Sequence, residues 1–487
     1  MAKQIWDFST QSILLALRSN LVPEPADCLA IQTSIAEAEE WLLSNGKGGS
    51  LSSSDAEFDE IRNFISLSSS RLAPIRRLLP EILSIIFLHP SIYSPPALGL
   101  EHTSPVTAVS SHWRAVALTT PALWSRFSIS LHGSEGAFQM LRLYLQRSKA
   151  SSLTIEIRQK AHRGSIHPGI VDHLIQSSDR WMRVTFPLDH YTLSLFNAVR
   201  GRLSSLEVAS FSDRSVGSDP EVSLQDIIAF EDAPKLHSLS LRNVGQNLPR
   251  FPLEQLERAL FTNMAGSTVF ATISRSPNLR SLTCHWPAIL PGMLLEVPTV
   301  LFSSLTTITL KGDFILLRNL AVPNLTSLAF TDMQRLPGPV IASFIEQSQC
   351  RLHTLVFDKV WTHGSSLLQI LRAAATLHTL TITWGKPNLV TETAMEALIV
   401  APGGEPLLPA LREFTLYGAY LFHTSTLLDM LESRSQSVTD APRLHIADMQ
   451  LDHRLFSDEQ LERFRRLKGS LDLTLQYTNA QKVSVQI

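Results

Sequence analysis

The sequence predicts an α/β protein in two parts: an all-α amino-terminal region, then an irregular solenoid with parallel strands inside and helices outside. Three observations support this division. Apolar residues recur at helical spacing before about residue 126, they alternate as in strands after it, and one strand pattern returns from about residue 203 to residue 450. The expected parts are a helical lead-in over 1–72, a compact helical domain over 73–126 and the repeat domain over 127–487.

The lead-in is expected to contain helices joined by a flexible connector. Apolar residues between Pro23 and Leu43 fall on one helical face, and a second pattern of this kind follows Asp55. Glycine and serine dominate 46–54, which predicts a linker. Two helices joined in this way form an antiparallel hairpin. Two interpretations stay open, a short coiled coil that pairs chains and a lead-in that packs locally, because heptads are not sustained.

Three short helices are expected between residues 73 and 126, each begun by a proline. Proline suits the first helical position because the amide that it lacks has no partner there. The starts are Pro80, Pro105 after Ser104, and Pro121 after Thr120, and the two hydroxyl residues can cap the turn that follows them. Helices this short make a core too small to be stable alone, so part of their apolar surface is expected to contact a partner.

This helical domain resembles an F-box. The residues that carry the resemblance are Leu78-Leu79-Pro80-Glu81-Ile82-Leu83, Ile86-Phe87, Val109, Trp113-Arg114 and Ala117. The continuation Thr120-Pro121-Ala122-Leu123-Trp124 is similar to the F-box proteins that are numerous in mushroom-forming fungi. The chain departs from the usual pattern at Ser110-Ser111, where Cys-Arg is common, and in a long polar gap over 91–104.

The resemblance implies a function and a partner. F-box helices dock on the small Skp-type linker subunit of a cullin-RING (Skp/cullin/F-box) ubiquitin ligase, and a repeat domain holds the protein target. The chain would then be a substrate-recognition adaptor in the Ubl conjugation pathway and not itself an enzyme. The residues expected to bind the linker subunit are Leu78, Pro80, Ile82, Leu83, Ile86, Phe87, Val109 and Trp113. The alternative is a protein-interaction scaffold without a ligase, whose amino-terminal helices only cap the repeats.

The repeat domain is predicted from a strand signature, Leu-x-x-φ-x-φ, in which φ is apolar. Clear copies begin at Leu236, Leu279, Leu305, Leu325, Leu352, Leu377 and Leu411, and weaker copies begin at Leu203 and Leu444. Helix-like pieces lie between them, and a strand plus a helix every 20 to 34 residues or so is typical of a leucine-rich repeat solenoid. The usual asparagine ladder is missing, so the repeats are expected to be irregular.

A proline stands two residues before several of the leading leucines. These prolines are Pro234, Pro277, Pro323, Pro409 and Pro442. Proline cannot continue a helix and disfavours helical backbone before it. We therefore expect it to end the preceding helix and to hold the chain extended into the strand.

Side chains at the ends of the strands are the candidates for binding a protein target. The third and fifth positions of the signature are mostly small hydroxyl residues, which suit a solvated strand surface. More discriminating residues come after the strands, and aromatic and arginine side chains dominate binding hot spots. The expected target contacts are Arg242, His285, Trp286, Lys311, Asp358, Trp361, Trp384 and Tyr417. The alternative for the tryptophans is packing beneath loops.

Composition limits the other classes of function. The formal net charge of −2 argues against nucleic acid or an anionic membrane bound by bulk electrostatics. Cys28, Cys284 and Cys350 are far apart, which fits a reducing compartment, and the apolar run Ile13-Leu14-Leu15-Ala16-Leu17 is too short to span a membrane. These features predict a cytoplasmic or nuclear protein.

Signatures of catalysis are scarce in the sequence. The segment 46–49 lacks phosphate-loop spacing, and 132–136 lacks the first glycine of a nucleophile elbow. His162, His167 and His173 are clustered, but their spacing fits no standard zinc pattern. We therefore expect no enzyme activity, cofactor or metal. A hydrolase built on divergent repeats would need a converging nucleophile, base and oxyanion donor, and no such set is evident.

Overall fold

The structure is a computed structural model, and the chain forms two compact units within it, Met1–Val184 and Thr185–Ile487. The residues that it describes are 10–19, 22–45, 55–89, 97–98, 105–158, 165–187, 190–212, 226–244, 248–286, 299–312, 314–362, 364–385, 389–401, 405–418, 420–435, 443–451, 456–478 and 484–486.

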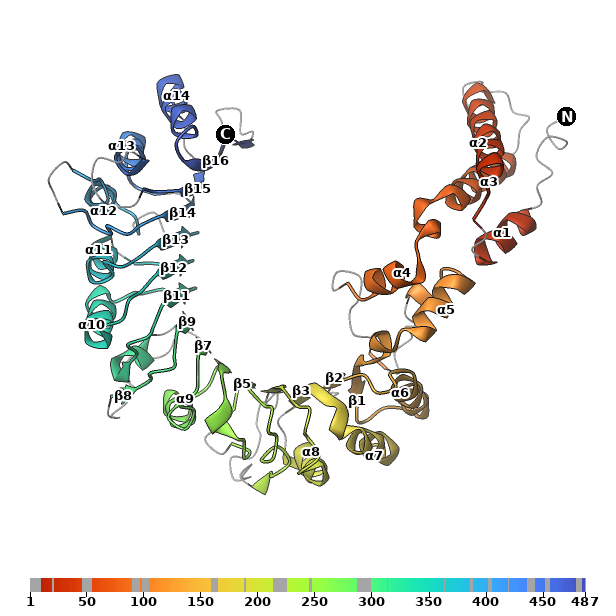
Figure 1. Cartoon of the computed structure of the whole chain (residues 1–487), viewed down its shortest axis with the longest axis horizontal. Coiled ribbons are helices and arrows are strands. Elements are labelled where there is room, and N and C mark those ends of the chain that lie inside the picture. Colours follow the sequence, from red (N-terminus) through yellow and green to blue (C-terminus); the bar gives the residue numbers. More distant parts are fainter. Residues whose placement is uncertain are drawn as a thin grey trace. The chain divides into compact units, whose positions relative to one another are not determined.

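Three helices begin the first unit: α1 (Thr10–Ser19), α2 (Pro25–Asn45) and α3 (Asp55–Leu72). Helices α2 and α3 lie side by side, as the expected hairpin requires, and the rings of Trp41 and Phe58 are 5.5 Å apart between them (Figure 1). Helix α1, which the sequence analysis did not predict, contacts α3 and buries Ile13 and Leu17. The linker predicted over 46–54 lies outside the described residues.

The segment 73–126 contains two α-helices with short 3-10 turns around them. The elements are η2 (Pro74–Arg77), α4 (Pro80–Phe87), η3 (Pro105–Thr107), α5 (Ser111–Thr119) and η4 (Pro121–Trp124). Pro80 begins α4 as predicted, whereas Pro105 and Pro121 begin only short 3-10 turns in place of the expected amphipathic helices. Helix α5 begins only at Ser111, because the hydroxyl of Ser110 accepts the N–H of Trp113 at 3.1 Å and caps it. Pro121 opens a single 3-10 turn that the side chain of Thr120 does not cap. Ser104 lies outside the described residues.

The rest of the first unit alternates strands and helices. Its elements are β1 (Arg126–Ser130), α6 (Glu135–Arg147), β2 (Leu153–Arg158), α7 (Pro168–Gln176), η5 (Ser178–Arg180) and β3 (Trp181–Pro187), which contains the boundary between the units. Strand β1 pairs in parallel with β2, so that Phe127 lies opposite Ile155 and Ile129 opposite Ile157. All four side chains are buried. The predicted alternation of buried and exposed residues is confirmed in β2, whereas in β1 Ser128 and Ser130 of the other face are buried as well.

The second unit is a solenoid-like α/β fold with a large parallel sheet. The strands of its main sheet are β4 (Val208–Ser212), β5 (Ser238–Arg242), β6 (Arg258–Thr262), β7 (Ser281–His285), β9 (Thr307–Lys311), β11 (Ser327–Thr331), β12 (Thr354–Asp358), β13 (Thr379–Thr383), β14 (Glu413–Gly418), β15 (Ile446–Leu451), β16 (Asp472–Thr478) and β17 (Ser484–Gln486). They are hydrogen-bonded in this order, and only β17 is antiparallel to its neighbour. Strands β8 (Val300–Leu301) and β10 (Leu320–Ala321) form a separate pair.

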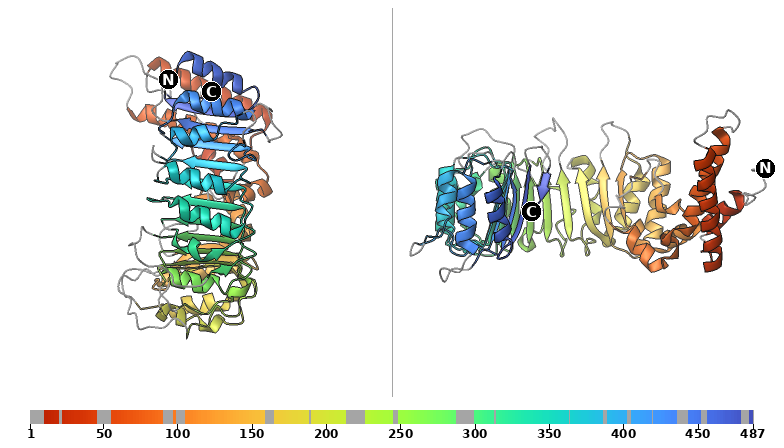
Figure 2. Two further views of the ribbon diagram at one scale, coloured as in Figure 1. Left: turned by 90° about the vertical axis from the view of Figure 1, so that its left-hand side faces the viewer. Right: turned by 90° about the horizontal axis from the view of Figure 1, so that it is seen from above.

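Helices connect the strands and cover one face of this sheet. They are α8 (His190–Ser194), η6 (Asn197–Val199), η8 (Leu253–Gln255), α9 (Gly266–Ile273), η9 (Ile315–Asn319), α10 (Gly338–Ser348), α11 (Gly364–Ala373), α12 (Glu392–Ala397), α13 (Thr424–Ser435) and α14 (Asp458–Leu467). From α10 to α14 they stack in chain order along one side of the strands (Figures 1 and 2). None of the helices in the described ranges has the length and apolar character that crossing a bilayer demands.

The core of the second unit follows from the strand register. Counting the leading leucine as position one, positions four and six of each copy point toward the helices and are buried. Leu328 lies opposite Ile308 on one side and Leu355 on the other, and the rings of Phe330 and Phe357 stack at 5.8 Å. Positions three, five and seven form the opposite, open face, where side chains remain partly exposed.

Two strand assignments need correction. The copy at Leu256, which leads into β6, is missing from the prediction because Ala259 takes the place of the larger apolar residue at position four. The first weak copy begins at Leu206 and not at Leu203. Leu206 donates its N–H to the carbonyl of Leu203 at 3.3 Å, as Leu236 does to Ala233 at 3.1 Å.

The prolines before the leading leucines lie in turns, so the expectation of extended chain is wrong. After four of these prolines, the N–H of the leading leucine donates back to the carbonyl three residues earlier, for example from Leu279 to Ser276 at 3.1 Å and from Leu325 to Val322 at 3.2 Å. Proline then occupies the second position of a β-turn, where its fixed φ is favourable. The same turn holds Pro234, Pro277, Pro323 and Pro409, while Pro442 lies outside the described residues.

In most copies, the residue at position eight follows the end of the strand and has left-handed backbone. Its positive φ angles occur at Asn243, Asn263, Gly312, Asp332, Lys359, Trp384 and Gly418. Several of these residues extend the hydrogen-bond ladder by one step, as where the N–H of Lys359 donates to Thr383 at 2.8 Å and that of Trp384 to Tyr417 at 2.7 Å. Asparagine and glycine adopt this conformation readily, whereas lysine and tryptophan do not.

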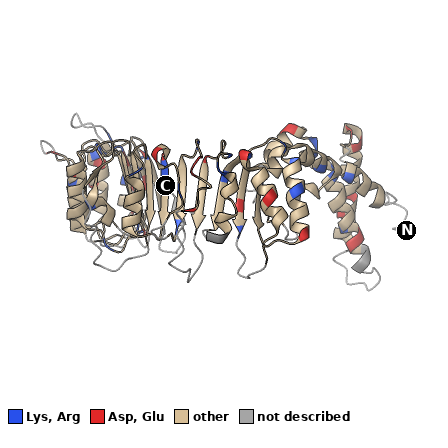
Figure 3. Cartoon of the chain, turned by 90° about the horizontal axis from the view of Figure 1, so that it is seen from below, with Lys and Arg blue, Asp and Glu red and all other residues tan. Residues whose placement is uncertain are grey.

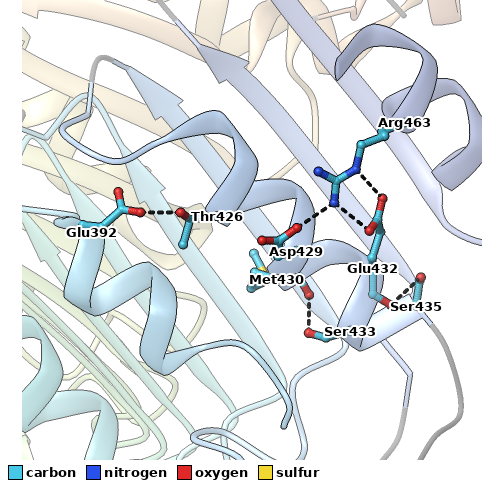
Figure 4. A network of polar contacts seen from close by, with 8 residues as sticks. All are labelled: Glu392, Thr426, Asp429, Met430, Glu432, Ser433, Ser435 and Arg463. Atoms are coloured by element: carbon cyan, nitrogen blue, oxygen red, sulfur yellow. Dashed lines mark hydrogen bonds and ion pairs between the residues drawn. The ribbon is translucent and has the colours of Figure 1, made fainter. Parts of the chain in front are cut away.

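Polar contacts connect the last helices of the stack. The guanidinium of Arg463 on α14 pairs with Asp429 and with Glu432 on α13, each at 2.7 Å, and the hydrogen bond to Glu432 contributes most to raising the Arg463 pKa (Figure 4). On the other side of α13, the hydroxyl of Thr426 donates to Glu392 of α12. Because every one of these partners joins neighbouring helices, the network is a structural connection and not a candidate site.

Candidate functional sites

The first candidate is the outer surface of α4. Its inner face holds the helix in place, because Leu83 and Phe87 are buried and the ring of Phe87 lies 4.9 Å from that of Trp113 on α5. The outer face carries Leu79, Ile82 and Ile85, which are 65%, 43% and 65% exposed. We call these three residues the α4 surface.

The structure separates the predicted linker-binding residues into three groups. Leu83 and Phe87 are buried; Leu78, Ile86 and Trp113 are half-buried; Pro80, Ile82 and Val109 are exposed. The sequence analysis did not assign Leu79 and Ile85 to this role. Their spacing of three residues from Ile82 was the available signal, because residues three apart lie on one face of a helix.

The second candidate is the edge of the sheet where the strands end, formed by positions seven and eight of successive copies. We call it the strand-exit edge. Most of the predicted target-binding residues lie on it, with Arg242 and Trp384 exposed and His285, Lys311, Asp358 and Tyr417 half-buried. Trp361 comes two residues later in its copy and is exposed.

Trp286 requires a correction. Only 4% of it is exposed, and its indole N–H donates to the carbonyl of Met264 at 2.7 Å. The structure therefore places this tryptophan beneath the surface, as the alternative interpretation proposed. Trp384 has the same position in its own copy but is 43% exposed.

A basic pocket occupies the part of the strand-exit edge at β7 and β9. The cavity has a volume of about 320 Å³ and is lined by Thr262, His285, Trp286, Lys311, Gly312, Asp332 and Gln334. The ammonium of Lys311 lies 3.3 Å from the carboxylate of Asp332. Burial, followed by the charges of Lys311 and Arg242, lowers the pKa of His285. Two cations, Lys311 and Arg242, act on His285, against the single carboxylate of Asp332, so positive charge predominates around the pocket.

An aromatic–acidic cluster occupies the edge between β12 and β15, and we define it as Asp358, Trp384, Tyr417 and Asp448. The rings of Trp384 and Tyr417 are 6.1 Å apart in a T-shaped arrangement. The hydroxyl of Tyr417 donates to the Asp448 carboxylate, a hydrogen bond that, more than burial, raises the pKa of Tyr417 to about 12. Asp358 accepts the hydroxyl of Thr383 at 2.7 Å. Asp448 was not among the residues predicted from the sequence, although it stands at position five, where other copies have mostly small residues.

The described part of the chain contains no group of three or more His, Cys, Asp or Glu side chains that could hold a metal ion. His167 instead pairs with Glu135 at 3.3 Å and stacks on the ring of Phe138, while burial raises the pKa of the Cys284 thiol. Along the ribbon as drawn in Figure 3, positions of Lys and Arg are interspersed with positions of Asp and Glu.

Comparison of the chain with models of known protein families gives no match, and no curated protein matches it significantly. The α4 surface and the strand-exit edge therefore provide the observations from which a function can be inferred.

Proposed function

We propose that this chain is the substrate-recognition adaptor of a cullin-RING ubiquitin ligase. The F-box-like helices dock on a Skp-type linker subunit, and through it on a cullin, while the leucine-rich repeat domain holds a protein target. Ubiquitin transfer is left to other subunits. The observation that carries the proposal is the α4 surface, a row of exposed apolar side chains on a helix whose opposite face is already packed.

The geometry of α4 favours a docked partner over a simple cap. The helix has eight residues, and its inner face, with the buried Leu83 and Phe87, packs against α5. Leu79, Ile82 and Ile85 then form a second apolar face with no role in that contact. Covering such side chains contributes about 25 cal/mol for each Å² of apolar surface removed from water. Neighbouring exposed apolar side chains are typical of protein-interaction sites.

The second unit supports the other half of the proposal. Its open face and strand-exit edge carry polar, charged and aromatic side chains on a sheet whose opposite face is filled by buried leucines and phenylalanines. A rigid sheet of this kind fixes the side chains at its surface, so that a partner meets a pre-organised site and less ordering entropy is lost on binding.

The decisive experiment substitutes the exposed face of α4 and leaves its packed face intact. Ile82→Asp combined with Ile85→Asp should reduce co-purification with a Skp-type linker subunit by at least about tenfold, since charge would face an apolar partner surface. Phe87 is unsuitable for this test because an aspartate in its buried position would unfold the helix pair.

The matched control places two aspartates on equally exposed leucines of another helix. Leu29 and Leu43 on α2 are as exposed as Leu79, so Leu29→Asp combined with Leu43→Asp should leave co-purification unchanged. Equal binding by both double variants would refute the assignment of the α4 surface. If the wild-type chain co-purifies with no Skp-type protein, the scaffold function without a ligase is the better description, and the strand-exit edge would then hold the partner of the scaffold.

A further inference from the structure

Trp384 has an unfavourable backbone conformation at an exposed position. Its φ is 54°, in the left-handed region that bulky residues rarely adopt. Equivalent positions in other copies carry Asn243, Asn263 and Gly312, which enter this region easily. The side chain is 43% exposed, so burial of the indole does not account for the choice of tryptophan. Strained residues of this kind are concentrated at binding and catalytic sites.

The surroundings of Trp384 suit a cation. Asp358 and Asp448 provide two carboxylates, and the Tyr417 ring meets the indole edge-to-face. The exposed Lys359, on the neighbouring strand, supplies one opposing charge and leaves the cluster with a net negative charge. Tryptophan is the best aromatic partner of a guanidinium or ammonium group, and nearby carboxylates strengthen the attraction.

The basic pocket lies on the same edge at a distance that an extended chain can span. From Lys311 on β9, the strand order leads through β11 and β12 to Trp384 after β13 and Tyr417 on β14. Three or four steps of about 4.8 Å correspond to about 14–19 Å. An extended segment rises about 3.3 Å per residue, so four to six residues or so cover this distance. The two sites have opposite charge.

We propose that the strand-exit edge binds an extended segment of a partner protein through two oppositely charged side chains. An arginine or lysine of the segment stacks on Trp384 between Asp358 and Asp448, and an aspartate or glutamate about five residues away enters the basic pocket beside Lys311 and His285. The proposal deepens the proposed function, because this segment would belong to the protein target. It does not require the ligase contact.

The first test measures the binding of labelled peptides to the full chain by fluorescence polarisation. The probe carries one arginine and one glutamate five positions apart in a threonine–serine background, which favours an extended chain. We expect saturable binding below about 1 mM. Replacing the arginine by its neutral isostere citrulline should weaken binding about five- to thirty-fold. Replacing the glutamate by glutamine should weaken it about two- to fivefold.

Equal affinity for the arginine and citrulline peptides would overturn the proposal, and so would absence of saturable binding up to about 1 mM. A probe whose two charged residues are adjacent should bind no better than a probe with the arginine alone. If the adjacent arrangement binds as tightly as the spaced one, the two-site geometry is wrong.

Trp384→Asn separates recognition from stability. Asparagine adopts left-handed backbone more readily than tryptophan, so the thermal midpoint should stay the same or rise. Affinity for the arginine probe should fall about five- to thirty-fold. Lys359→Asn is the matched control at the same position of the neighbouring copy, and it should keep or slightly increase affinity because a cation is removed. A lower midpoint with unchanged affinity in Trp384→Asn would show a structural role and contradict the proposal.

Asp358→Asn provides a second variant that retains a hydrogen-bond acceptor for Thr383. It should weaken binding of the arginine probe about two- to fivefold and leave the citrulline probe unaffected. Equal effects on both probes would contradict the charge assignment. Peptide binding is measured without the linker subunit, so failure here leaves the co-purification result intact, and a failed co-purification leaves the peptide result intact.

Discussion

The strands of the second unit and helix α4 of the first use similar apolar side chains but bury them to different extents. Leu328 on β11 is fully buried between Ile308 and Leu355, whereas Leu79 and Ile85 of α4 are largely exposed. A strand inside a parallel sheet has a neighbour at fixed spacing on each side, so every inward residue meets its equivalent in the next copy. A short helix with apolar residues on two faces can pack only one of them. In a repeat sheet, each strand therefore buries the apolar side chains of its neighbours. A short helix with two apolar faces leaves one of them exposed to water, where a partner can cover it.

The largest expected effect tests this comparison directly. Leu328→Ala should lower the free energy of unfolding by about 2–5 kcal/mol, because it leaves a cavity between three strands. Ile85→Ala should change it by less than about 0.5 kcal/mol, since the side chain is already in water. Denaturant titrations of both variants supply the measurement. Similar losses at the two positions would mean that Ile85 is packed in the isolated chain and that the contrast is false.

A smaller effect is expected at Arg434, a charged exception to the apolar interior of the second unit. Its buried guanidinium donates to the carbonyls of Leu398 at 2.7 Å, Leu407 at 2.6 Å and Leu408 at 3.1 Å, and burial lowers its pKa to about 10. Arg434→Met leaves the carbonyls of Leu398 and Leu407 without this donor, while the carbonyl of Leu408 keeps the N–H of Leu411, and should cost about 2–4 kcal/mol. Arg434→Lys should recover only part of this, because one nitrogen replaces three. Wild-type stability in Arg434→Met would show that the carbonyls find other donors.

A gain in stability is expected at Lys359, where the backbone is left-handed with a φ of 53°. Lys359→Asn should raise the free energy of unfolding by about 0.5–1 kcal/mol, because asparagine tolerates this conformation better. Lys359→Ala keeps the steric cost of a β-carbon and should give no gain. Thermal and denaturant unfolding of the three proteins would measure the difference. A gain of equal size in both variants would point to the lysine charge as the cause.

The smallest expected effect is a change in the pH dependence of stability, caused by His285 on the open face of the sheet. Burial and two nearby cations lower the pKa of His285 below its ordinary value of 6.5. The unfolded chain therefore takes up this proton at a higher pH than the folded chain, so the free energy of unfolding falls as the pH drops through about 6.5. His285→Asn should flatten that part of the pH profile, measured by denaturation between about pH 8 and pH 5. If the wild-type chain and His285→Asn had the same dependence of unfolding free energy on pH, His285 would be solvated in the folded chain.

Much of the fold could be predicted because its pattern is local. Alternation of apolar residues identified β5, β7, β9 and the strands β11 to β15, and Pro80 identified the start of α4. The copy at Leu256 was missed because Ala259 weakens the apolar signal while still filling its place in the core. The prolines before the leucines were assigned to extended chain because a preference for one φ does not distinguish a turn from a strand.

The candidate sites could be predicted less well, since burial depends on neighbours distant in the sequence. Trp286 and Trp384 stand at the same position of their copies, yet one donates its indole N–H to Met264 in the interior and the other is exposed beside Tyr417. Asp448 joins the cluster only because β15 lies next to β14 in register. No spacing within one copy contains this information.

The sequence by itself determined the order of elements, the inward face of each strand and the supply of apolar residues on both faces of α4, because each depends on a period of two or of 3.6 residues. The tertiary structure alone decided which of those apolar residues remain exposed and which charged and aromatic side chains from different copies become neighbours. These side chains become neighbours because strands that are dozens of residues apart in the sequence pair in register through hydrogen bonds. The pattern of one segment cannot predict which residues of another segment will lie beside it.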